Sequence, residues 1–402
     1  MSNDYKRGSF QLMKSINRST VLNMIREKAP ISRAEIAKQT KLTPPTVGNI
    51  VKELIDEQFI LETTQGVSHG GRKPTFLEIR ADQFFIIGID VGKFTMKFIV
   101  ANLHGFPVDR FTLEIPSANQ LLNTMKKGIS TLIEKEEHFH KRFLGIGIGM
   151  HGIVNTETGV SLYAPFFDTY NISIKSELEA EYNMLVRVEN DAKTMTLGES
   201  WIGNGNQASK LVGINVGHGI GAGITIKGEL YQGEHFIAGE IGHMTIDLSG
   251  PLCSCGNYGC LQALAAGPAI AENAIKALKA GKSSYIRELA GDDLDRIDGS
   301  IIHKAAIQGD PFSIELLNQT GRYLGIGITN LIHMINPERI ILGGGVAQSG
   351  NFILDPIKET IKNRGLTEEA KNTPIVFSKL GKDASAIGAS VLILKHFYQG
   401  LR

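Results

Sequence analysis

Two segments of the sequence repeat one pattern, and this repeat constrains the fold more than any other feature. Ile86–Gly92 reads IIGIDVG and Leu211–Gly217 reads LVGINVG, and each leads into a second apolar run, at Phe98–Ala101 and at Gly223–Lys227. A strand, a glycine turn and a returning strand form a hairpin whose backbone N–H groups can surround phosphate oxygens. The repeat predicts two similar α/β lobes around a cleft, although glycine-bounded apolar strands also recur by chance.

The first 80 residues differ from the rest in net charge and in the distribution of apolar and glycine residues. They contain 13 Lys and Arg against 8 Asp and Glu, whereas the remaining 322 contain 29 against 33, so the net charge of +1 conceals a basic segment. Apolar runs that alternate with glycine turns begin only after this segment. Because single cores stop growing at roughly 250–300 residues, we expect a small basic domain at 1–80 and two lobes at 81–200 and 201–402. The C-terminal helix is expected to return to the first lobe.

The basic segment has the order of a winged helix-turn-helix. A helix is predicted at about 15–28, and Ser32 with Glu35 forms a capping box that starts a second helix. Thr43 as N-cap and Pro44 at the first helical position start a third, amphipathic helix. Two short strands are predicted at 59–63 and 75–79, as in a wing.

The outer face of the third helix has the small and polar side chains that a recognition helix needs in the major groove of double-stranded DNA. Basic residues in the wing loop can reach phosphates or a narrow minor groove. A domain that binds only protein is the alternative. The predicted DNA contacts are Arg33, Thr43, Pro44, Thr46, Asn49, Lys52, Arg72 and Lys73.

All three cysteines fall within eight positions, as Cys253-x-Cys255-x4-Cys260, and His243 precedes them by ten residues. Three Cys and one His make a closed tetrahedral set suited to structural Zn²⁺. An odd number of cysteines so closely spaced does not indicate a disulfide framework. Three unrelated buried thiols are the alternative to a metal.

Several polar residues are expected to meet near this loop. Asn190 and Asp191 follow an apolar strand and precede a helix, where such a pair is also a common helix cap. Glu240 precedes His243 by three residues, and Gln262 follows the last cysteine. Carboxylate, amide and imidazole groups fixed by a rigid loop suit a polyhydroxyl ligand.

The run Gly239-Glu240-x-Gly242-His243, followed by Cys253-x-Cys255-Gly256-x-x-Gly259-Cys260, resembles the signature of the ROK family of repressors, open reading frames and kinases. The resemblance is to its sugar-responsive repressor branch, which includes the xylose repressors. It implies an α/β fold: an N-terminal winged helix-turn-helix domain followed by a two-lobed actin/hexokinase-like (ribonuclease H-like) sugar-kinase-type body. It also implies zinc on His243, Cys253, Cys255 and Cys260, and sugar contacts at Asn190, Asp191, Glu240, His243, Gln262 and Gly152.

The departures from the family pattern separate repressor from kinase. Family kinases begin with Asp-x-Gly-Gly-Thr, whereas this chain has Asp90-Val91-Gly92-Lys93-Phe94. The second phosphate loop, usually Gly-Thr-Gly, is Gly217-His218-Gly219, and Gln262 replaces a sugar-binding glutamate. Asp191, which matches the catalytic base of the kinases, is retained. This pattern predicts sugar sensing without phosphoryl transfer, so not an enzyme.

The prediction is therefore a transcriptional repressor of carbohydrate-utilisation genes, controlled by a sugar or sugar phosphate. A homodimer or tetramer is expected to bind a palindromic operator, because two-fold symmetry fixes the spacing of the half-sites. Without a signal peptide or an apolar run of 18 residues, a cytoplasmic protein that does not contact membranes is expected. An active ATP-dependent sugar kinase with a DNA-binding domain is the alternative, and a body that binds a transport-system protein is a third reading.

Overall fold

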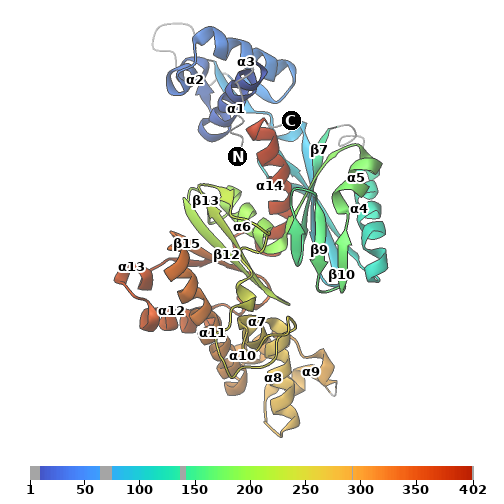
Figure 1. The fold of residues 1–402 in the computed structure, drawn as a ribbon, viewed down its shortest axis with the longest axis vertical. Coiled ribbons are helices and arrows are strands. Elements are labelled where there is room, and N and C mark those ends of the chain that lie inside the picture. Colours follow the sequence, from blue (N-terminus) through green and yellow to red (C-terminus); the bar gives the residue numbers. More distant parts are fainter. Residues whose placement is uncertain (1–9, 64–74, 136–141, 292, 401–402) are drawn as a thin grey trace, which may run out of the picture. The chain divides into compact units, whose positions relative to one another are not determined.

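The computed structural model describes residues 10–63, 75–135, 142–291 and 293–400, drawn as ribbons in Figure 1. The chain divides into two compact units. The first consists of residues 1–148, 173–188 and 389–402, and the second of residues 149–172 and 189–388.

The N-terminal part of the first unit has the predicted order of helices and strands. Ser32 and Glu35 form the capping box, and the Thr43 side chain accepts from the backbone N–H of Thr46. Lys41, with φ 59°, ends the second helix in the left-handed conformation. The elements are α1 (Phe10–Lys28), β1 (Ile31–Ser32), α2 (Arg33–Thr40), α3 (Pro44–Asp56), β2 (Ile60–Thr63) and β3 (Phe76–Ile79).

The three helices and the wing strands enclose a small apolar core. Strands β2 and β3 pair antiparallel, and β1 adds a third strand to give the order β1-β3-β2. Helix α1 begins five residues before the predicted start. The prediction missed these first residues because Met13 and Ile16 are both 54% exposed, so the first turns have no buried apolar face. The fully buried side chains are Val21, Ile25, Ile36, Val47, Val51, Leu54 and Leu77.

A five-stranded sheet follows in the first unit, with the order β11-β7-β4-β5-β6. Strands β4 and β5 form the first predicted hairpin, in which Ile89 pairs with Phe98. Helix α4 packs closely on β5, since a Cβ on Gly128 would lie 2.1 Å from the Phe98 ring. The elements are η1 (Ala81–Gln83), β4 (Phe85–Val91), β5 (Thr95–Asn102), β6 (Pro107–Glu114), η2 (Ala118–Gln120), α4 (Leu121–Lys135), β7 (Phe143–Met150), α5 (Ile174–Tyr182) and β11 (Leu185–Asn190).

The second unit contains a five-stranded sheet of order β14-β13-β12-β15-β16. Strands β12 and β13 form the second predicted hairpin, and β12 pairs parallel with β15. In both sheets the repeated strand is central and its hairpin partner lies beside it, so the sequence repeat is confirmed as a structural repeat. The strands are β12 (Lys210–Val216), β13 (Ile220–Ile226), β14 (Glu229–Leu230), β15 (Arg339–Gly343) and β16 (Ile375–Phe377).

The remainder of the second unit is a small sheet and a helical layer. The small sheet has the order β10-β9-β8, from β8 (Ile153–Asn155), β9 (Val160–Ala164) and β10 (Thr169–Ile172). The helices are α6 (Asp191–Ile202), η3 (Ile241–His243), α7 (Leu261–Ala265), α8 (Gly267–Lys279), α9 (Tyr285–Ala290), η4 (Leu294–Arg296), α10 (Gly299–Ile307), α11 (Pro311–Ile335), η5 (Val346–Ser349), α12 (Asn351–Arg364), α13 (Glu368–Lys371) and η6 (Gly381–Asp383). Over the described residues, none of the helices has the length and apolarity needed to cross a membrane.

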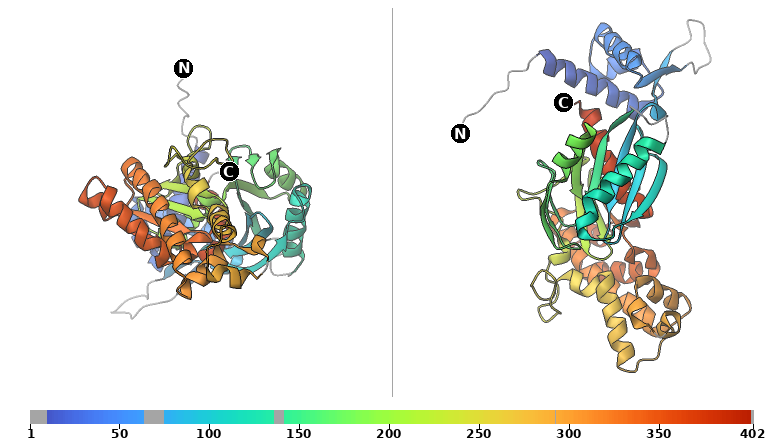
Figure 2. Two further views of the ribbon diagram at one scale, coloured as in Figure 1. Left: turned by 90° about the horizontal axis from the view of Figure 1, so that it is seen from below. Right: turned by 90° about the vertical axis from the view of Figure 1, so that its right-hand side faces the viewer.

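The last helix, α14 (Ala384–Gln399), begins among residues of the second unit and ends among residues of the first. Its C-terminal end lies beside α1 (Figures 1 and 2), where the Asn23 amide donates to the Tyr398 carbonyl at 2.8 Å. The Tyr398 hydroxyl donates to the carbonyl of Leu103 at 3.0 Å. One helix end therefore contacts both the N-terminal helices and the first large sheet.

Candidate functional site

The start of α6 positions the first two predicted sugar contacts. Asn190 is the N-cap of this helix, and its Oδ1 accepts from the backbone N–H groups of Ala192 and Lys193 at 2.9 and 3.1 Å. The helix-cap alternative is thus correct for Asn190, whose Nδ2 also donates to the Gly152 carbonyl at 2.9 Å. The Asp191 Oδ2 accepts from Asn215 Nδ2 at 3.3 Å. The Asn190 side chain therefore connects Gly152 to the first turn of α6, which carries Asp191.

Strand β13 brings the other predicted contacts to the same place. Its glycines let α6 approach closely, since a Cβ on Gly223 would lie 2.9 Å from Lys193 Cα. The Ala222 N–H donates to the Gly239 carbonyl at 2.8 Å, which positions the segment that carries Glu240 and His243. The Ile220 N–H donates to Gln262 Oε1 at 3.0 Å. Gln262 and the segment that carries Glu240 and His243 therefore contact β13, and the helix that begins with Asp191 packs on the same strand.

A buried ionic network lies behind Glu240. Lys193 is 1% exposed, and its Nζ donates to Gln232 Oε1 and to the Phe236 carbonyl, both at 2.8 Å. The Gln232 amide donates in turn to Glu189, which is 2% exposed. Burial raises the pKa of Glu189 and of Glu240, whereas the nearby Lys193 ammonium acts to lower both. Burial likewise lowers the pKa of Lys193.

The four predicted metal ligands form one cluster. The Cys253 Sγ lies 3.7 Å from His243 Nδ1, and the Cys255 and Cys260 sulfurs are also 3.7 Å apart. All four ligand atoms lie within 4.8 Å of one another. Ligands held about 2.0–2.3 Å from one tetrahedral ion would be separated by about 3.3–3.8 Å. The donor set and its spacing therefore fit a single metal ion.

Burial and local hydrogen bonds give the thiols of this cluster different acidities. Desolvation raises the pKa of the buried Cys260 thiol to about 12. A hydrogen bond from the Asn257 backbone lowers the pKa of the exposed Cys255 thiol. Burial lowers the pKa of His243, which favours the neutral imidazole that binds metals.

The predicted DNA contacts lie mostly on the outer face of α3. Thr43, Pro44, Asn49 and Lys52 are exposed, while the Thr46 hydroxyl is hydrogen-bonded to that of Thr43 at 2.8 Å. Arg33, at the start of α2, makes an ion pair of 2.5 Å with Glu62 on β2. Arg72 and Lys73 lie outside the described residues.

Comparison with protein families assigns both parts of the chain. The model of the ROK family matches residues 86–396, and a model of winged helix-turn-helix DNA-binding domains matches residues 15–60. The chain belongs to the ROK family.

Its relatives within this family include named repressors. The chain is 34% identical over 390 residues to the xylose repressor of Caldicellulosiruptor bescii, covering 96% of this chain and 97% of that protein. It is 30% identical over 387 residues to the xylose repressor of Bacillus subtilis, covering 96% of each. It is 29% identical over 396 residues to the N-acetylglucosamine repressor of Escherichia coli, covering 98% and 96%.

Solved structures of ROK proteins have the same fold. A ROK family transcriptional regulator, a homologue of the E. coli MLC protein, superposes with a TM-score of 0.84 at 31% identity, over 97% of this chain and 98% of that one. A ROK glucokinase from Streptomyces griseus, solved with glucose and AMPPNP, gives a TM-score of 0.70 at 28% identity, over 77% and 98%. Together with the two family models, these matches confirm a winged helix followed by a sugar-kinase-type ROK body.

Three residues of the ROK body that the sequence prediction missed lie at or beside this site: His151, Lys193 and Gln232. His151 follows the end of β7 and precedes Gly152, and Lys193 lies two positions after Asp191. A lysine inside a helix and a histidine in a loop carry no pattern that distinguishes a buried side chain from a solvated one. Lys193 is buried because glycines of β13 leave room for α6 to approach.

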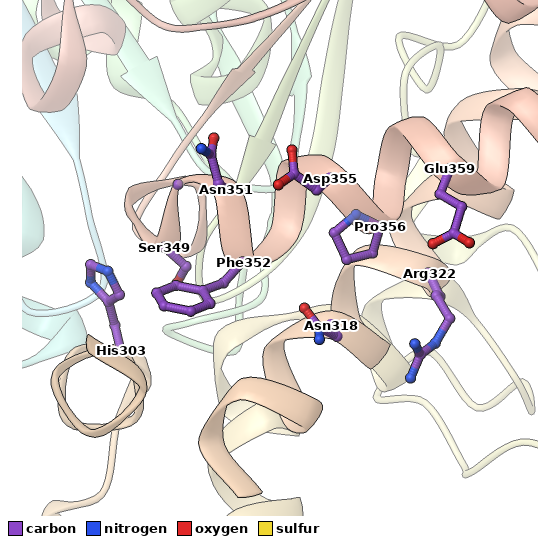
Figure 3. A pocket seen from close by; sticks show the side chains of 10 residues that line it. His303, Asn318, Arg322, Ser349, Asn351, Phe352, Asp355, Pro356 and Glu359 are labelled. Carbon is purple, nitrogen blue, oxygen red and sulfur yellow. The ribbon is translucent and has the colours of Figure 1, made fainter. Parts of the chain in front are cut away.

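A pocket elsewhere in the ROK body contains none of the predicted site residues. It lies between α10, α11 and the start of α12, and Figure 3 shows polar side chains around it. Arg322 on its edge is already paired with Glu315. The lining residues are His303, Asn318, Arg322, Ser349, Gly350, Asn351, Phe352, Asp355, Pro356 and Glu359.

Proposed function

We propose that this protein is a DNA-binding transcriptional repressor of carbohydrate-utilisation genes whose operator binding is modulated by a sugar. The observation that carries the proposal is the presence, in one chain, of a winged helix-turn-helix domain and a ROK body. Relatives named xylose repressor and N-acetylglucosamine repressor match both parts. We infer that it acts in the cytoplasm on double-stranded DNA.

In this proposal α3 enters the major groove of a palindromic operator. Thr43, Pro44, Thr46 and Asn49 would approach base edges, and Lys52 would contact a phosphate. Arg33, which is paired with Glu62, would contact the DNA backbone. Arg72 and Lys73 are proposed to contact DNA from the wing. A homodimer or tetramer supplies the second winged helix that a palindrome requires.

The effector site is proposed at Asn190, Asp191, Glu240, His243, Gln262 and the backbone of Gly152. Hydroxyl groups both donate and accept, so carboxylates at Asp191 and Glu240 suit the donors of a sugar, and the Gln262 amide offers either role. Gln262, the segment that carries Glu240 and His243, and the helix that begins with Asp191 meet at β13, which supports one shared ligand.

We propose that the metal of the His–Cys₃ cluster is structural zinc. A full set of four protein ligands leaves no coordination position for a reactive water. When bound, the ion would supply rigidity, because it would fix the loop that carries His243 and, three residues earlier, Glu240. The second ring nitrogen of His243 would then remain for the sugar.

The second candidate, an active sugar kinase, is favoured by Asp191 and by the likeness to a solved glucokinase. Against it stand Lys93 and Phe94, which replace the glycine and threonine that give ATP phosphates access to the backbone in the kinases. Both side chains are exposed at the β4–β5 turn, and Lys93 Nζ lies 4.9 Å from the centre of the Phe94 ring. We infer that the body senses sugar and does not phosphorylate it.

Helix α14 is the proposed route from effector to operator. Its first turn contacts α6, where the Thr194 and Ser385 hydroxyls are 3.0 Å apart and a Cβ on Gly388 would lie 1.6 Å from the Thr194 carbonyl oxygen. Its last turn holds α1 through Asn23. We propose that the DNA-binding domain spans 1–80 and the lobes 81–200 and 201–402, and that this helix is the returning C-terminal segment. A sugar that shifts the start of α6 would therefore bias the winged helices.

Fluorescence anisotropy with DNA from upstream of the protein's own gene tests the proposal. We expect binding whose logarithm falls linearly with the logarithm of salt concentration, and release by at least one sugar. Asn23→Ala should keep operator affinity but weaken the sugar response, whereas Lys14→Ala, at an exposed ion pair with Glu53, should leave both unchanged. Binding that is indifferent to salt and to every sugar would disprove the repressor. ADP release that depends on a sugar would instead establish the kinase.

A further inference from the structure

His151 is a buried side chain whose ring nitrogens lack hydrogen-bond partners within the described part of the chain. It is 3% exposed, and neither ring nitrogen has a hydrogen-bond partner among the described residues. Phe166 and Phe167, in the turn between β9 and β10, cover its ring at centroid distances of 4.3 and 5.0 Å. Buried polar side chains are nearly always paired, so an imidazole kept here with two orphan nitrogens indicates an absent partner.

The surroundings of His151 belong to the proposed effector site. The carbonyl of the next residue, Gly152, accepts from the Asn190 amide, which caps the helix that starts with Asp191. Phe166 also makes an edge contact of 5.8 Å with His218 in the β12–β13 turn. The imidazole therefore lies beside two proposed sugar contacts, and a ligand would reach it when the Phe166–Phe167 turn shifts.

The charge of the same surroundings disfavours a phosphate group. The segments that form the site, residues 149–172, 189–196, 215–224 and 232–262, contain one Lys, no Arg and seven Asp or Glu. That single cation, Lys193, already donates to Gln232 and to Phe236. The N-terminus of α6 is filled by the Asn190 side chain. Besides backbone N–H groups such as those of the Gly217–Gly219 turn, phosphates are held by Arg, Lys or free helix N-termini, and these segments provide none of these last three.

The protonation behaviour of the buried groups agrees with this. Burial raises the pKa of Glu189 and Glu240, because desolvation disfavours their charged forms. Burial lowers the pKa of His151 to about 3, so its imidazole is neutral. A neutral imidazole has one donor and one acceptor, as a hydroxyl group does, and it has no charge to offer a phosphate.

We propose that the effector is an uncharged, unphosphorylated sugar and that one of its hydroxyl groups is the hydrogen-bond partner of His151. The inference rests on the proposed function, because it names the ligand class of the same site. It also adds His151 to the residues that determine which sugar is accepted.

Matched pairs of probes test the ligand class. Glucose with glucose 6-phosphate, N-acetylglucosamine with its 6-phosphate, and xylose alone are titrated into the full-length, metal-loaded protein by calorimetry and added to the operator complex. We expect an uncharged sugar to bind and to release the operator, and its phosphate to bind at least about 100-fold more weakly. A phosphate that binds as tightly as its free sugar overturns the inference and leaves the sugar-responsive repressor intact. If no probe binds or changes operator affinity, the proposed sugar response itself fails.

Substitution of the imidazole tests the contact. His151→Phe keeps an aromatic ring and removes both orphan nitrogens, so the sugar-free melting temperature should stay the same or rise while sugar affinity falls about tenfold or more. His151→Gln, which keeps a donor and an acceptor, should retain more of the affinity than His151→Phe. Thr225→Val is the matched control, because the Thr225 hydroxyl is equally buried and unpartnered among the described residues but lies near the far end of β13. Wild-type sugar affinity in His151→Phe, with the melting temperature preserved, would show that the imidazole does not contact the ligand.

Discussion

The two repeated hairpins start from nearly the same sequence and have diverged at their turns. In the β4–β5 hairpin the Gly92 N–H donates to the Thr95 carbonyl at 2.9 Å, and the Phe94 side chain between them is 61% exposed. In the β12–β13 hairpin the turn is Gly217-His218-Gly219, and the Gly267 N–H at the start of α8 donates to the Gly217 carbonyl at 2.8 Å. One turn carries two large exposed side chains, Lys93 and Phe94, whereas the other carries one, His218, between two glycines.

The strands that return from these turns differ in the same way. On β5 a large side chain, Phe98, fills the space beneath α4. On β13 the residues opposite α6 include Gly221 and Gly223, which admit the helix with Asp191 at its start. The comparison teaches that a duplicated hairpin can keep its sheet position while one copy packs under a helix through a large side chain and the other, through glycines, packs against the proposed effector site.

The largest effect is expected when a predicted metal ligand beside the second hairpin is removed. Cys255→Ser should abolish zinc binding, measured as metal per chain, and with it the sugar response, because the loop that holds Glu240 and His243 loses its fixed geometry. Ser249→Ala, at an exposed position of the same loop, is the control and should keep both. Loss of zinc with an unchanged sugar response would separate the metal from the effector site.

Asp191→Asn tests the carboxylate at the start of α6. The Asn215 amide can still donate to the new side chain, so the fold should persist, but a charged acceptor is lost. Hydrogen bonds to charged groups contribute about 1.5–3 kcal/mol, so sugar affinity should fall about 10- to 150-fold with zinc retained. Calorimetry measures the affinity. The control Asp56→Asn changes an exposed carboxylate at the end of α3, in the first unit, and should leave sugar affinity unchanged.

The sequence predicted the hairpins, the winged helix and the metal set because each is a local pattern. The alternation of apolar runs with glycine, the Ser32–Glu35 box and the cysteine spacing all lie within a few residues. His151 and Lys193 could not be found in this way, since their burial depends on strands and turns far away in sequence. Gln262 was predicted as a sugar contact, but the hydrogen bond that its Oε1 accepts from the Ile220 N–H, 42 positions earlier, could not be predicted from a local pattern.

A smaller effect is expected at Gln262. Gln262→Leu removes the acceptor for the Ile220 N–H next to the second turn, and an unsatisfied buried donor costs about 1–3 kcal/mol of the free energy of unfolding. Gln262→Glu keeps an acceptor at that position and should lose less. Urea denaturation measures both variants. Equal stability of the leucine variant and the wild type would mean that the Gln262 side chain does not stabilise the start of β13.

The smallest effect on sugar sensing is expected at the first hairpin, where Lys93→Gly and Phe94→Thr together restore the family's kinase residues. Both side chains are exposed, so the free energy of unfolding should change by no more than about 0.5 kcal/mol per substitution. Sugar affinity, measured by calorimetry, should stay within about twofold of wild type. Because glycine and threonine open the turn to phosphate oxygens, the double variant should bind ATP more tightly than the wild type does. A tenfold loss of sugar affinity in this variant would mean that the first hairpin belongs to the sensor and that the two copies have not divided their roles. Tighter ATP binding without ADP release would place the remaining defect in the second turn, where His218 stands between two glycines.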